Sequence, residues 1–187
     1  GPDSFEKDPD PDAPTRGGKA VAVPGHVAGM LYALEKYGTL PREVVLAPAI
    51  RLAEAGYDAD AHYVESSKEV IEWLNEAPGR AERFPFLWER LLMRGAVKVG
   101  DRVRLPEQGK LLRAIAAEGA RAFYSGPVAD AIVKAARDDR SEITLDDLRS
   151  YKVEERAPLT TTFRGNTVLS MPPPSSGVIV LAHVLGM

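Results

Sequence analysis

Apolar residues recur at helical spacing along the first three quarters of the chain. Val27, Met30, Leu31 and Leu34 follow the i, i+3, i+4, i+7 pattern that places side chains on one face of a helix. Glycine commonly ends a helix, so we expect this one to stop at Gly38. The pattern predicts an amphipathic helix that turns these four side chains toward a core.

The same periodicity predicts further helices downstream. Pro41 suits the first turn of a second helix, Pro48 should kink or restart it, and Gly56 should end it. A third helix is expected over 60–75, before a Pro-Gly pair. A fourth is expected over 106–118, because proline begins that segment and glycine follows it.

Shorter helices follow. The inward positions of one of them should be Val128, Ala131, Ile132 and Ala135. Thr144, with Asp147 three residues later, has the spacing of an N-terminal capping pair and predicts a short helix to Tyr151. Residues 80–105 show no clear period, and we assign them no element.

Strand-forming residues are concentrated near the C-terminus. Two such runs, 159–163 and 167–171, flank a break at 164–166 and predict a β-hairpin. A lone hairpin is marginally stable in water, so further sequence should complete its sheet. The prolines at 172–174 form a stiff connector, and Ser175-Ser176-Gly177 suits the start of an apolar helix. The fold class is therefore α+β and mainly helical.

Composition indicates a soluble globular domain and narrows the function. The 187 residues are 44% hydrophobic and 27% charged, and a formal net charge of −3 argues against a nucleic-acid-binding surface. No apolar run reaches the roughly 18 residues that span a bilayer, and no signal-peptide core is present, although processing could have removed one. The absence of cysteine excludes a disulfide framework, a thiol nucleophile and a thiolate metal site.

The N-terminal segment 1–19 should be a flexible arm, because it contains four prolines, five acidic residues and a Gly-Gly pair. Asp8, Asp10 and Asp12 alternate as in a calcium loop. However, Ala13 stands where such a loop requires glycine, and a lysine replaces its bidentate glutamate. We predict no calcium site.

Other motifs of binding and catalytic sites are incomplete in this chain, because required residues are missing. Gly17-Gly18-Lys19-Ala20 has the Gly-Lys pair of a phosphate-binding loop but lacks its first glycine and its magnesium-binding hydroxyl. His26, His62 and His183 are far apart, and none has a second histidine four residues away to form a metal pair. We interpret His26 as satisfying a backbone group at a helix start, and His183 as a partly buried, hydrogen-bonded side chain.

Clusters of charge and of hydroxyl groups favour structural roles. Residues 137–140 read as a solvated helix end and Asp146-Asp147 as a helix first turn, whereas Arg51 and Glu54 are spaced to pair on the second helix. Thr160-Thr161-Thr162 suits a hairpin strand. Ser175 and Ser176 are better helix caps than nucleophiles, because no histidine or lysine is positioned by sequence to act as their base.

Several segments together resemble the γ-glutamyltransferase (γ-glutamyltranspeptidase) family. Ser170-Met171-Pro172-Pro173-Pro174-Ser175-Ser176-Gly177 is similar to a signature of its large subunit, and Val23-Pro24-Gly25-His26-Val27-Ala28-Gly29 to its Val-Pro-Gly-Thr-Val-Ala-Gly turn. Further similar segments, all in the family's order, are 35–41, 47–53, 122–126 and 143–148. His26 replaces the family's threonine, and Val178 replaces its second glycine.

The resemblance implies a portion of a large subunit: residues 20–187 as a helical lobe with a C-terminal hairpin and helix, an incomplete part of an N-terminal-nucleophile αββα sandwich. It implies an enzyme that transfers or hydrolyses the γ-glutamyl group of glutathione and related compounds. The reactive threonine of such a precursor, followed by threonine and histidine, would lie downstream, and the arginine that holds the substrate carboxylate upstream. The Thr160-Thr161-Thr162 run is followed by Phe163 and does not match.

No residue of this chain therefore matches a catalytic, substrate-binding or metal-binding position of the family, and no cofactor is implied. The implied partners are the rest of the precursor and glutathione or other γ-glutamyl compounds, with neither nucleic acid nor a membrane segment. The implied location is periplasmic or secreted in a bacterium. Two alternatives stay open: a non-enzymatic binding module of the same fold, and a related acylase with another substrate.

Overall fold

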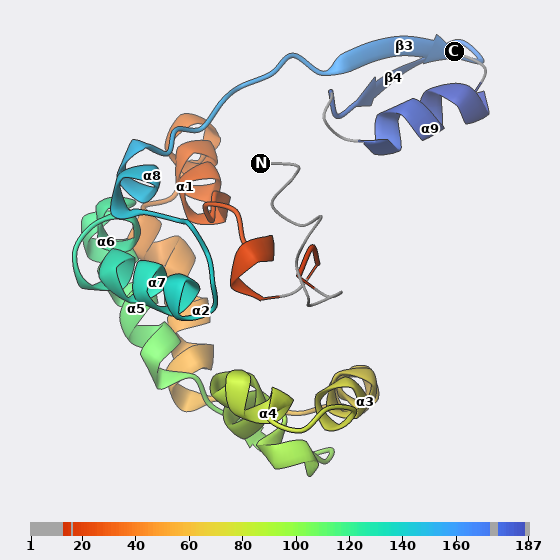
Figure 1. The fold of residues 1–187 in the computed structure, drawn as a ribbon. Coiled ribbons are helices and arrows are strands. Elements are labelled where there is room, and N and C mark those ends of the chain that lie inside the picture. The colour runs from red at the N-terminus through yellow and green to blue at the C-terminus, as the bar shows by residue number, and fades with distance from the viewer. Residues whose placement is uncertain (1–12, 16, 173–175, 186–187) are drawn as a thin grey trace. The chain divides into compact units, whose positions relative to one another are not determined.

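The computed structural model describes residues 13–15, 17–172 and 176–185. The chain divides into two compact units, residues 1–151 and 152–187, and each is considered by itself. Helices predominate in the first unit and a β-hairpin begins the second (Figure 1), which confirms the mainly helical α+β prediction. Among the described helices, none has the length and apolar character needed to cross a membrane.

The first unit alternates helices with a short strand pair. Its described helices are η2 (Gly18–Ala20), α1 (His26–Tyr37), α2 (Arg42–Ala55), α3 (Ala61–Asn75), α4 (Arg80–Arg83), η3 (Leu87–Leu91), η4 (Met93–Gly95), α5 (Pro106–Glu118), α6 (Arg121–Tyr124), α7 (Pro127–Asp138) and α8 (Leu145–Ser150). Strands β1 (Tyr57–Asp58) and β2 (Arg102–Val103) pair antiparallel. The predicted helices over 60–75 and 106–118 are confirmed, and the short helix from Thr144 is present with its cap.

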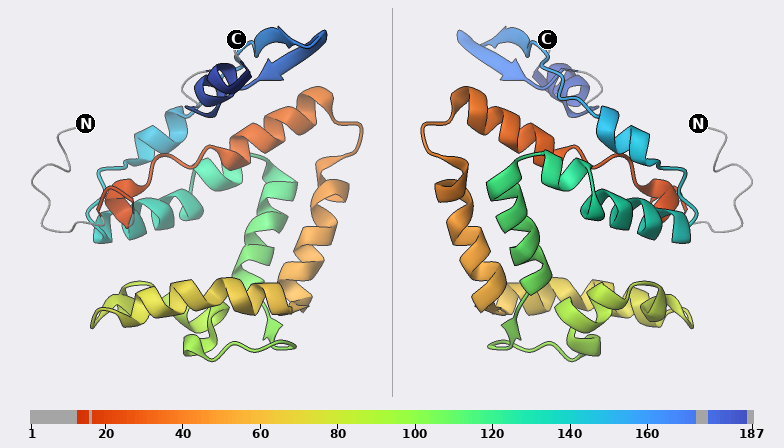
Figure 2. Two further views of the ribbon diagram at one scale, coloured as in Figure 1. Left: turned by 90° about the vertical axis from the view of Figure 1, so that its right-hand side faces the viewer. Right: turned by 90° about the vertical axis from the view of Figure 1, so that its left-hand side faces the viewer.

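Helices α2 and α5 lie side by side in the middle of this unit (Figure 2). Ile50 and Ala53 of α2 and Ile115 and Ala116 of α5 are buried. Gly109 brings the two helices close together, because a Cβ there would lie 2.6 Å from Cγ of Glu54. The buried positions on α5 agree with the face that its periodicity predicts.

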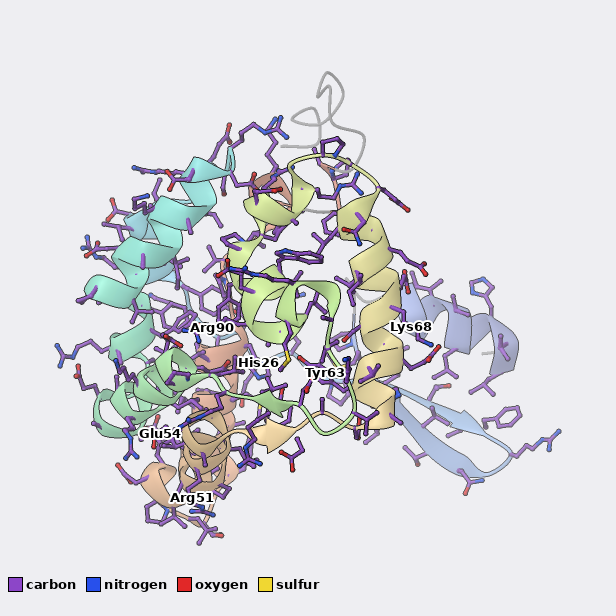
Figure 3. All side chains as sticks on the ribbon, turned by 90° about the horizontal axis from the view of Figure 1, so that it is seen from below. His26, Arg51, Glu54, Tyr63, Lys68 and Arg90 are labelled. Carbon is purple, nitrogen blue, oxygen red and sulfur yellow. The ribbon has the colours of Figure 1, made fainter. Side chains whose placement is uncertain are left out.

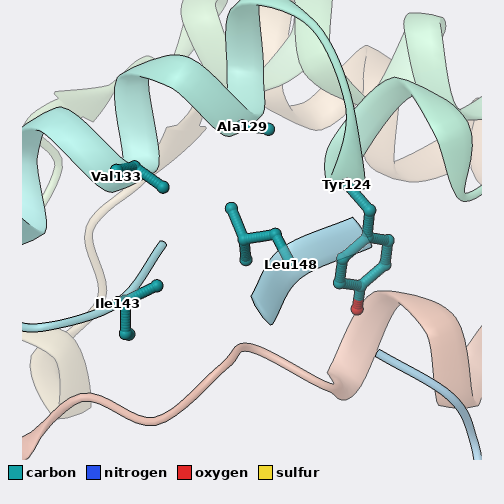
Figure 4. Close-up of a cluster of buried hydrophobic side chains, with 5 residues drawn as sticks. All are labelled: Tyr124, Ala129, Val133, Ile143 and Leu148. Carbon is teal, nitrogen blue, oxygen red and sulfur yellow. The ribbon is translucent and has the colours of Figure 1, made fainter. Parts of the chain in front are cut away.

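Two separate hydrophobic cores lie at the two ends of this helix pair. One, which we call the α7–α8 core, is formed by the buried residues Tyr124, Ala129, Val133, Ile143 and Leu148 (Figure 4). The other, the β1–β2 core, is formed by Ala59, Val97 and Val103, with partly buried residues of α3 and η3 packed against it. In the β1–β2 core the Tyr63 hydroxyl donates to the Leu91 carbonyl oxygen at 3.0 Å, and burial raises the pKa of Tyr63.

The structure corrects several expectations for this unit. Helix α2 continues through Pro48, so the expected restart does not occur there, and the alternative of a kink stays a prediction. Residues 80–105, to which the sequence assigned no element, contain α4, η3, η4 and β2, and the β1–β2 ladder adds strands before Tyr151, where none was expected. Helix-capping signals do not mark two-residue strands that pair across more than forty positions, which is why the sequence did not reveal them.

Two predicted helix faces are partly wrong. Met30 is 59% exposed and α1 has no fully buried residue. On α7 the buried residues are Ala129 and Val133, while Ala131 and Ala135 are exposed. The α7–α8 core packs against the face of α7 that carries Ala129 and Val133. This face is shifted by one position from the predicted one.

In the second unit, β3 (Leu159–Phe163) and β4 (Asn166–Ser170) form the predicted hairpin, followed by α9 (Ser176–Leu185). Phe163 pairs with Asn166, so the turn contains only Arg164 and Gly165, both at positive φ, as a tight hairpin turn requires. The second strand thus begins one residue earlier than predicted. The start of α9 at Ser176 agrees with the predicted helix, whereas Ser175 lies outside the described residues.

Candidate functional site

The three histidines do not converge on a site. His26 is the first residue of α1 and His62 the second of α3, and both side chains are exposed. The His26 side chain makes no hydrogen bond within the described residues, so its expected role at a backbone group is not seen. His183 is exposed rather than partly buried, although its Nδ1 lies 2.7 Å from the Ile179 carbonyl oxygen. The described residues contain no group of three metal-ligating side chains.

The hydroxyl residues take structural positions. Thr160-Thr161-Thr162 lies within β3, with Thr161 half-buried and its neighbours exposed. Ser176 begins α9. Asp8, Asp10 and Asp12 of the rejected calcium loop lie outside the described residues.

Asp147 forms a capping box with Thr144 at the start of α8. Its carboxylate accepts from the Thr144 backbone N–H at 2.8 Å and from the Thr144 hydroxyl at 2.6 Å, and the Thr144 hydroxyl accepts from the Asp147 N–H at 3.2 Å. These hydrogen bonds from Thr144 lower the pKa of Asp147. The reciprocal box satisfies helix-terminal donors, so this carboxylate has a structural use.

A groove between α2 and α5 gathers charged residues. It has a volume of about 350 Å³, and its lining includes Glu43, Arg51 and Arg113. Arg51 and Glu54 both project from α2 (Figure 3). The spacing of Arg51 and Glu54 predicted that they pair, but this prediction is wrong. Instead, Arg113 binds both carboxylate oxygens of Glu54, at 2.6 and 2.7 Å. Arg113 thus binds Glu54 in the bidentate geometry in which a guanidinium holds a carboxylate most strongly.

This bidentate pair lowers the pKa of Glu54, through its hydrogen bond to Arg113 first and the Arg113 charge second. The Glu54–Arg113 pair is exposed and joins two helices. It places no general acid or general base beside a nucleophile. The arrangement is suited to joining α2 and α5 rather than to acid–base chemistry.

Arginines also cap the ends of the helix pair. Arg42 donates to the carbonyl oxygens of Ala116 and Ala117 at the end of α5, at 2.7 and 3.2 Å. At the end of α2, Arg104 donates to the Glu54 carbonyl oxygen from two nitrogens, at 3.1 and 2.9 Å. The last carbonyls of a helix lack partners within it, so these contacts satisfy them from the neighbouring segment.

A second polar cluster lies at the C-terminus of α7. Asp139 is not part of a freely solvated helix end, as the sequence suggested. Its Oδ2 accepts from the Gly18 N–H at 2.6 Å, and its Oδ1 accepts from Nε of Arg83 at 2.7 Å. Gly17 and Gly18 therefore lie against the Asp139 and Arg83 side chains. In the described part of the segment expected to be a flexible arm, Ala13 and Gly18 are buried.

The start of α1 is held by an aromatic cluster. The Tyr124 hydroxyl donates to the Pro24 carbonyl oxygen at 2.5 Å and accepts from the Ala28 N–H at 3.1 Å. Its ring stacks on Tyr151, with centroids 5.8 Å apart. Burial is the main cause that raises the pKa of Tyr124. A Cβ at Gly25 would lie 2.1 Å from the Tyr151 hydroxyl, so glycine permits this close approach.

Comparison with known proteins gives one consistent result. A model of the family described as Gamma-glutamyltranspeptidase matches residues 2–187. The glutathione hydrolase proenzyme of Pseudomonas sp. (strain A14) is 35% identical over 175 residues, which cover 94% of this chain and 30% of that relative. The chain thus spans less than a third of the length of this relative.

Solved structures agree with the sequence comparison. The γ-glutamyltranspeptidase of Helicobacter pylori has a TM-score of 0.80 at 35% identity, over 94% of this chain and 49% of that one. The cephalosporin acylase of Bacillus halodurans has a TM-score of 0.77 at 29% identity, over 90% of this chain and 31% of that one.

Proposed function

Because this chain belongs to the γ-glutamyltranspeptidase family, we propose that it is part of a proenzyme that transfers or hydrolyses the γ-glutamyl group of glutathione and related compounds. The observation that carries the proposal is the family match over 2–187 together with the similarity to the Helicobacter pylori enzyme. The remainder of the precursor is the chain's principal partner, in agreement with relatives named as proenzymes.

Within that enzyme, the chain acts as scaffold. Acyl transfer needs a nucleophile beside a base, donors for the oxyanion and a group that holds the substrate. The described side chains with perturbed pKa values, Glu54, Tyr63, Arg113, Tyr124 and Asp147, all serve helix ends or helix pairing instead. We therefore assign no catalytic, substrate-binding or metal-binding residue to this chain.

The chemistry then belongs to an N-terminal threonine elsewhere in the precursor. Its hydroxyl gives a proton to its own α-amino group and attacks the γ-glutamyl carbonyl. The α-amino group then passes that proton to the nitrogen of the donor, so that the C–N bond breaks, an ester forms and the amine of the donor leaves. Water or an acceptor amine next attacks the ester and restores the hydroxyl. Backbone N–H groups stabilise the oxyanion in both steps, and the mechanism requires no cofactor.

The test compares purified residues 1–187 with the complete precursor, using release of the chromophore from a γ-glutamyl anilide. We expect no release above background from residues 1–187 and saturable release from the precursor after self-cleavage. Thr161→Ala serves as the control within the precursor, because a strand threonine should leave kcat unchanged. Saturable hydrolysis by residues 1–187 that Thr161→Ala or Ser175→Ala abolishes would contradict the proposal.

One observation favours a second candidate, an acylase with another substrate: the similarity to the cephalosporin acylase of Bacillus halodurans. Comparing kcat/KM of the precursor for a γ-glutamyl anilide and for a side-chain amide of a cephalosporin separates the two. A precursor that neither cleaves itself nor hydrolyses either amide would instead support the non-enzymatic module.

A further inference from the structure

Three segments of the first unit meet at one carboxylate, that of Asp139. Its Oδ2 accepts from the Gly18 N–H at 2.6 Å. Its Oδ1 lies 2.7 Å from Nε and 2.6 Å from Nη2 of Arg83. The two side chains are 26% and 38% exposed, so water screens the ion pair only partly.

The glycine pair is shaped for this contact. A Cβ on Gly18 would lie 2.4 Å from the Asp139 carbonyl oxygen and 2.6 Å from that of Ala136. Backbone atoms cannot move aside to relieve contacts this short. Gly17 has a φ of +84°, and a Cβ there would lie 2.7 Å from Nη2 of Arg83. The Gly-Gly of the failed phosphate-loop motif thus allows a close approach to the C-terminus of α7.

The two partners of Asp139 belong to different parts of the unit. Gly18 and Asp139 lie beside the α7–α8 core, because η2 packs against α7. Arg83 ends α4, which packs on α3, and α3 contributes Tyr63 and Ile71 to the β1–β2 core. The Arg83–Asp139 pair therefore joins elements that belong to different cores.

The chain otherwise passes between these cores twice. Helix α2 leads from α1 to β1, and α5 leads back from β2 to α6 (Figure 2). At the junction of Gly17 with α3 and Phe84, a pocket of about 310 Å³ remains between the segments. Apolar packing is thus incomplete beside the polar contact.

We propose that Asp139, with Arg83 and Gly18, is a latch that closes the ring formed by the two cores and the α2–α5 pair, and so fixes the two cores relative to each other. Without it, the cores remain joined by the chain connections α2 and α5 and can hinge about that pair. The proposal is independent of the enzymatic function.

The test uses the lack of cysteine, which lets two spin labels be placed by substitution. Glu72→Cys on α3 and Ala135→Cys on α7 are both at exposed positions. Double electron–electron resonance then measures the distance distribution between the two elements. Asp138→Asn is the matched control, because Asp138 is the adjacent carboxylate and pairs at 2.5 Å with Lys134 of its own helix.

We expect one narrow distribution in the parent and in Asp138→Asn, and a broadened or displaced distribution in Asp139→Asn and in Arg83→Gln. The double variant should be no broader than either single one, because both remove the same interaction. Amide exchange over 18–20 should be about tenfold faster or more in Asp139→Asn, since a charge-assisted acceptor is lost. Circular dichroism establishes that each variant is folded.

Two results would overturn the latch. One is an Asp139→Asn distribution that matches that of Asp138→Asn. The other is additive broadening in the double variant, which would mean that Arg83 and Asp139 act separately.

Discussion

Replacing Tyr124 by phenylalanine tests how the start of α1 is held. Helix α1 has Gly25 at its N-cap position, and no side chain there accepts from the first N–H groups. The Tyr124 hydroxyl supplies the missing acceptor to the Ala28 N–H, from a residue 96 positions away, and donates to the Pro24 carbonyl oxygen. Tyr124→Phe removes both hydrogen bonds while retaining the ring.

The magnitude follows from the geometry. Tyr124 is 7% exposed, so water cannot easily replace the lost partners. A neutral hydrogen bond contributes about 0.5–1.5 kcal/mol net, and two of them give a destabilisation of about 1–3 kcal/mol. No cavity term is added, because the ring keeps its stacking on Tyr151 and its edge contact with Phe123.

Urea unfolding followed by circular dichroism, with amide exchange at Ala28, measures the effect. Tyr151→Phe is the control, because that hydroxyl lies in the same cluster and makes no hydrogen bond within the described residues. Its free energy of unfolding should change by no more than about 0.5 kcal/mol. Equal losses in the two variants would refute the assigned role of the Tyr124 hydroxyl.

The pH dependence of the folding stability gives a second test of the role of Tyr124. Burial raises the pKa of Tyr124 above its ordinary value of 10.0, so the folded state retains the phenolic proton more strongly than the unfolded state. This contribution to stability is complete below pH 10.0 and is lost as the pH rises through the folded-state pKa. Tyr124→Phe should therefore lose less stability than the parent over that alkaline range.

Three further outcomes are expected. Glu54→Gln should lower the urea midpoint at pH 7, because it removes the ion pair with Arg113. The difference from the parent should vanish as the pH falls below 4.5, the ordinary pKa of the carboxyl, and through the lowered folded-state pKa, and a difference that persists in acid would contradict this. In urea unfolding, Gly109→Ala should destabilise the chain by about 1–3 kcal/mol, because the new Cβ clashes with Glu54. Gly29→Ala should instead stabilise it by about 0.5–1 kcal/mol, because the space around its Cβ is open. Leu169→Lys should reduce self-association of residues 1–187 in sedimentation velocity, because Leu169 is 64% exposed on the hairpin; a parent that is strictly monomeric at high concentration would sink this expectation.

The sequence predicted those helices whose ends carry glycine or proline and whose apolar stripe is regular. Residues 106–118 and the box at Thr144 are examples, because each boundary signal acts within one turn. The segment 80–95 escaped prediction because it is built of single turns, including a π-helix over Leu87–Leu91 and consecutive left-handed residues at Met93 and Arg94. Such turns have no period to detect.

The candidate site was harder to predict, since charge pairing depends on distances that spacing does not contain. Arg51 and Glu54 are near in sequence, yet Glu54 binds an arginine 59 positions away. Asp139 looked like any acidic residue at a helix end, and only the fold brings Arg83 and Gly18 to it. The resemblance to a family, in contrast, rests on residue identities in order and needed no geometry.

The long-range polar contacts explain why several helices of this chain begin without a local cap. Gly25 and Pro41 stand where serine, threonine or aspartate would cap a helix, and neither supplies a side-chain acceptor. Tyr124 serves α1 instead, and Arg42 uses the start of α2 to satisfy the end of α5. A terminal group satisfied by a distant segment fixes one helix against another, which a local cap cannot do. Helix-end contacts of this kind therefore supply tertiary order in a unit whose apolar side chains form two small cores.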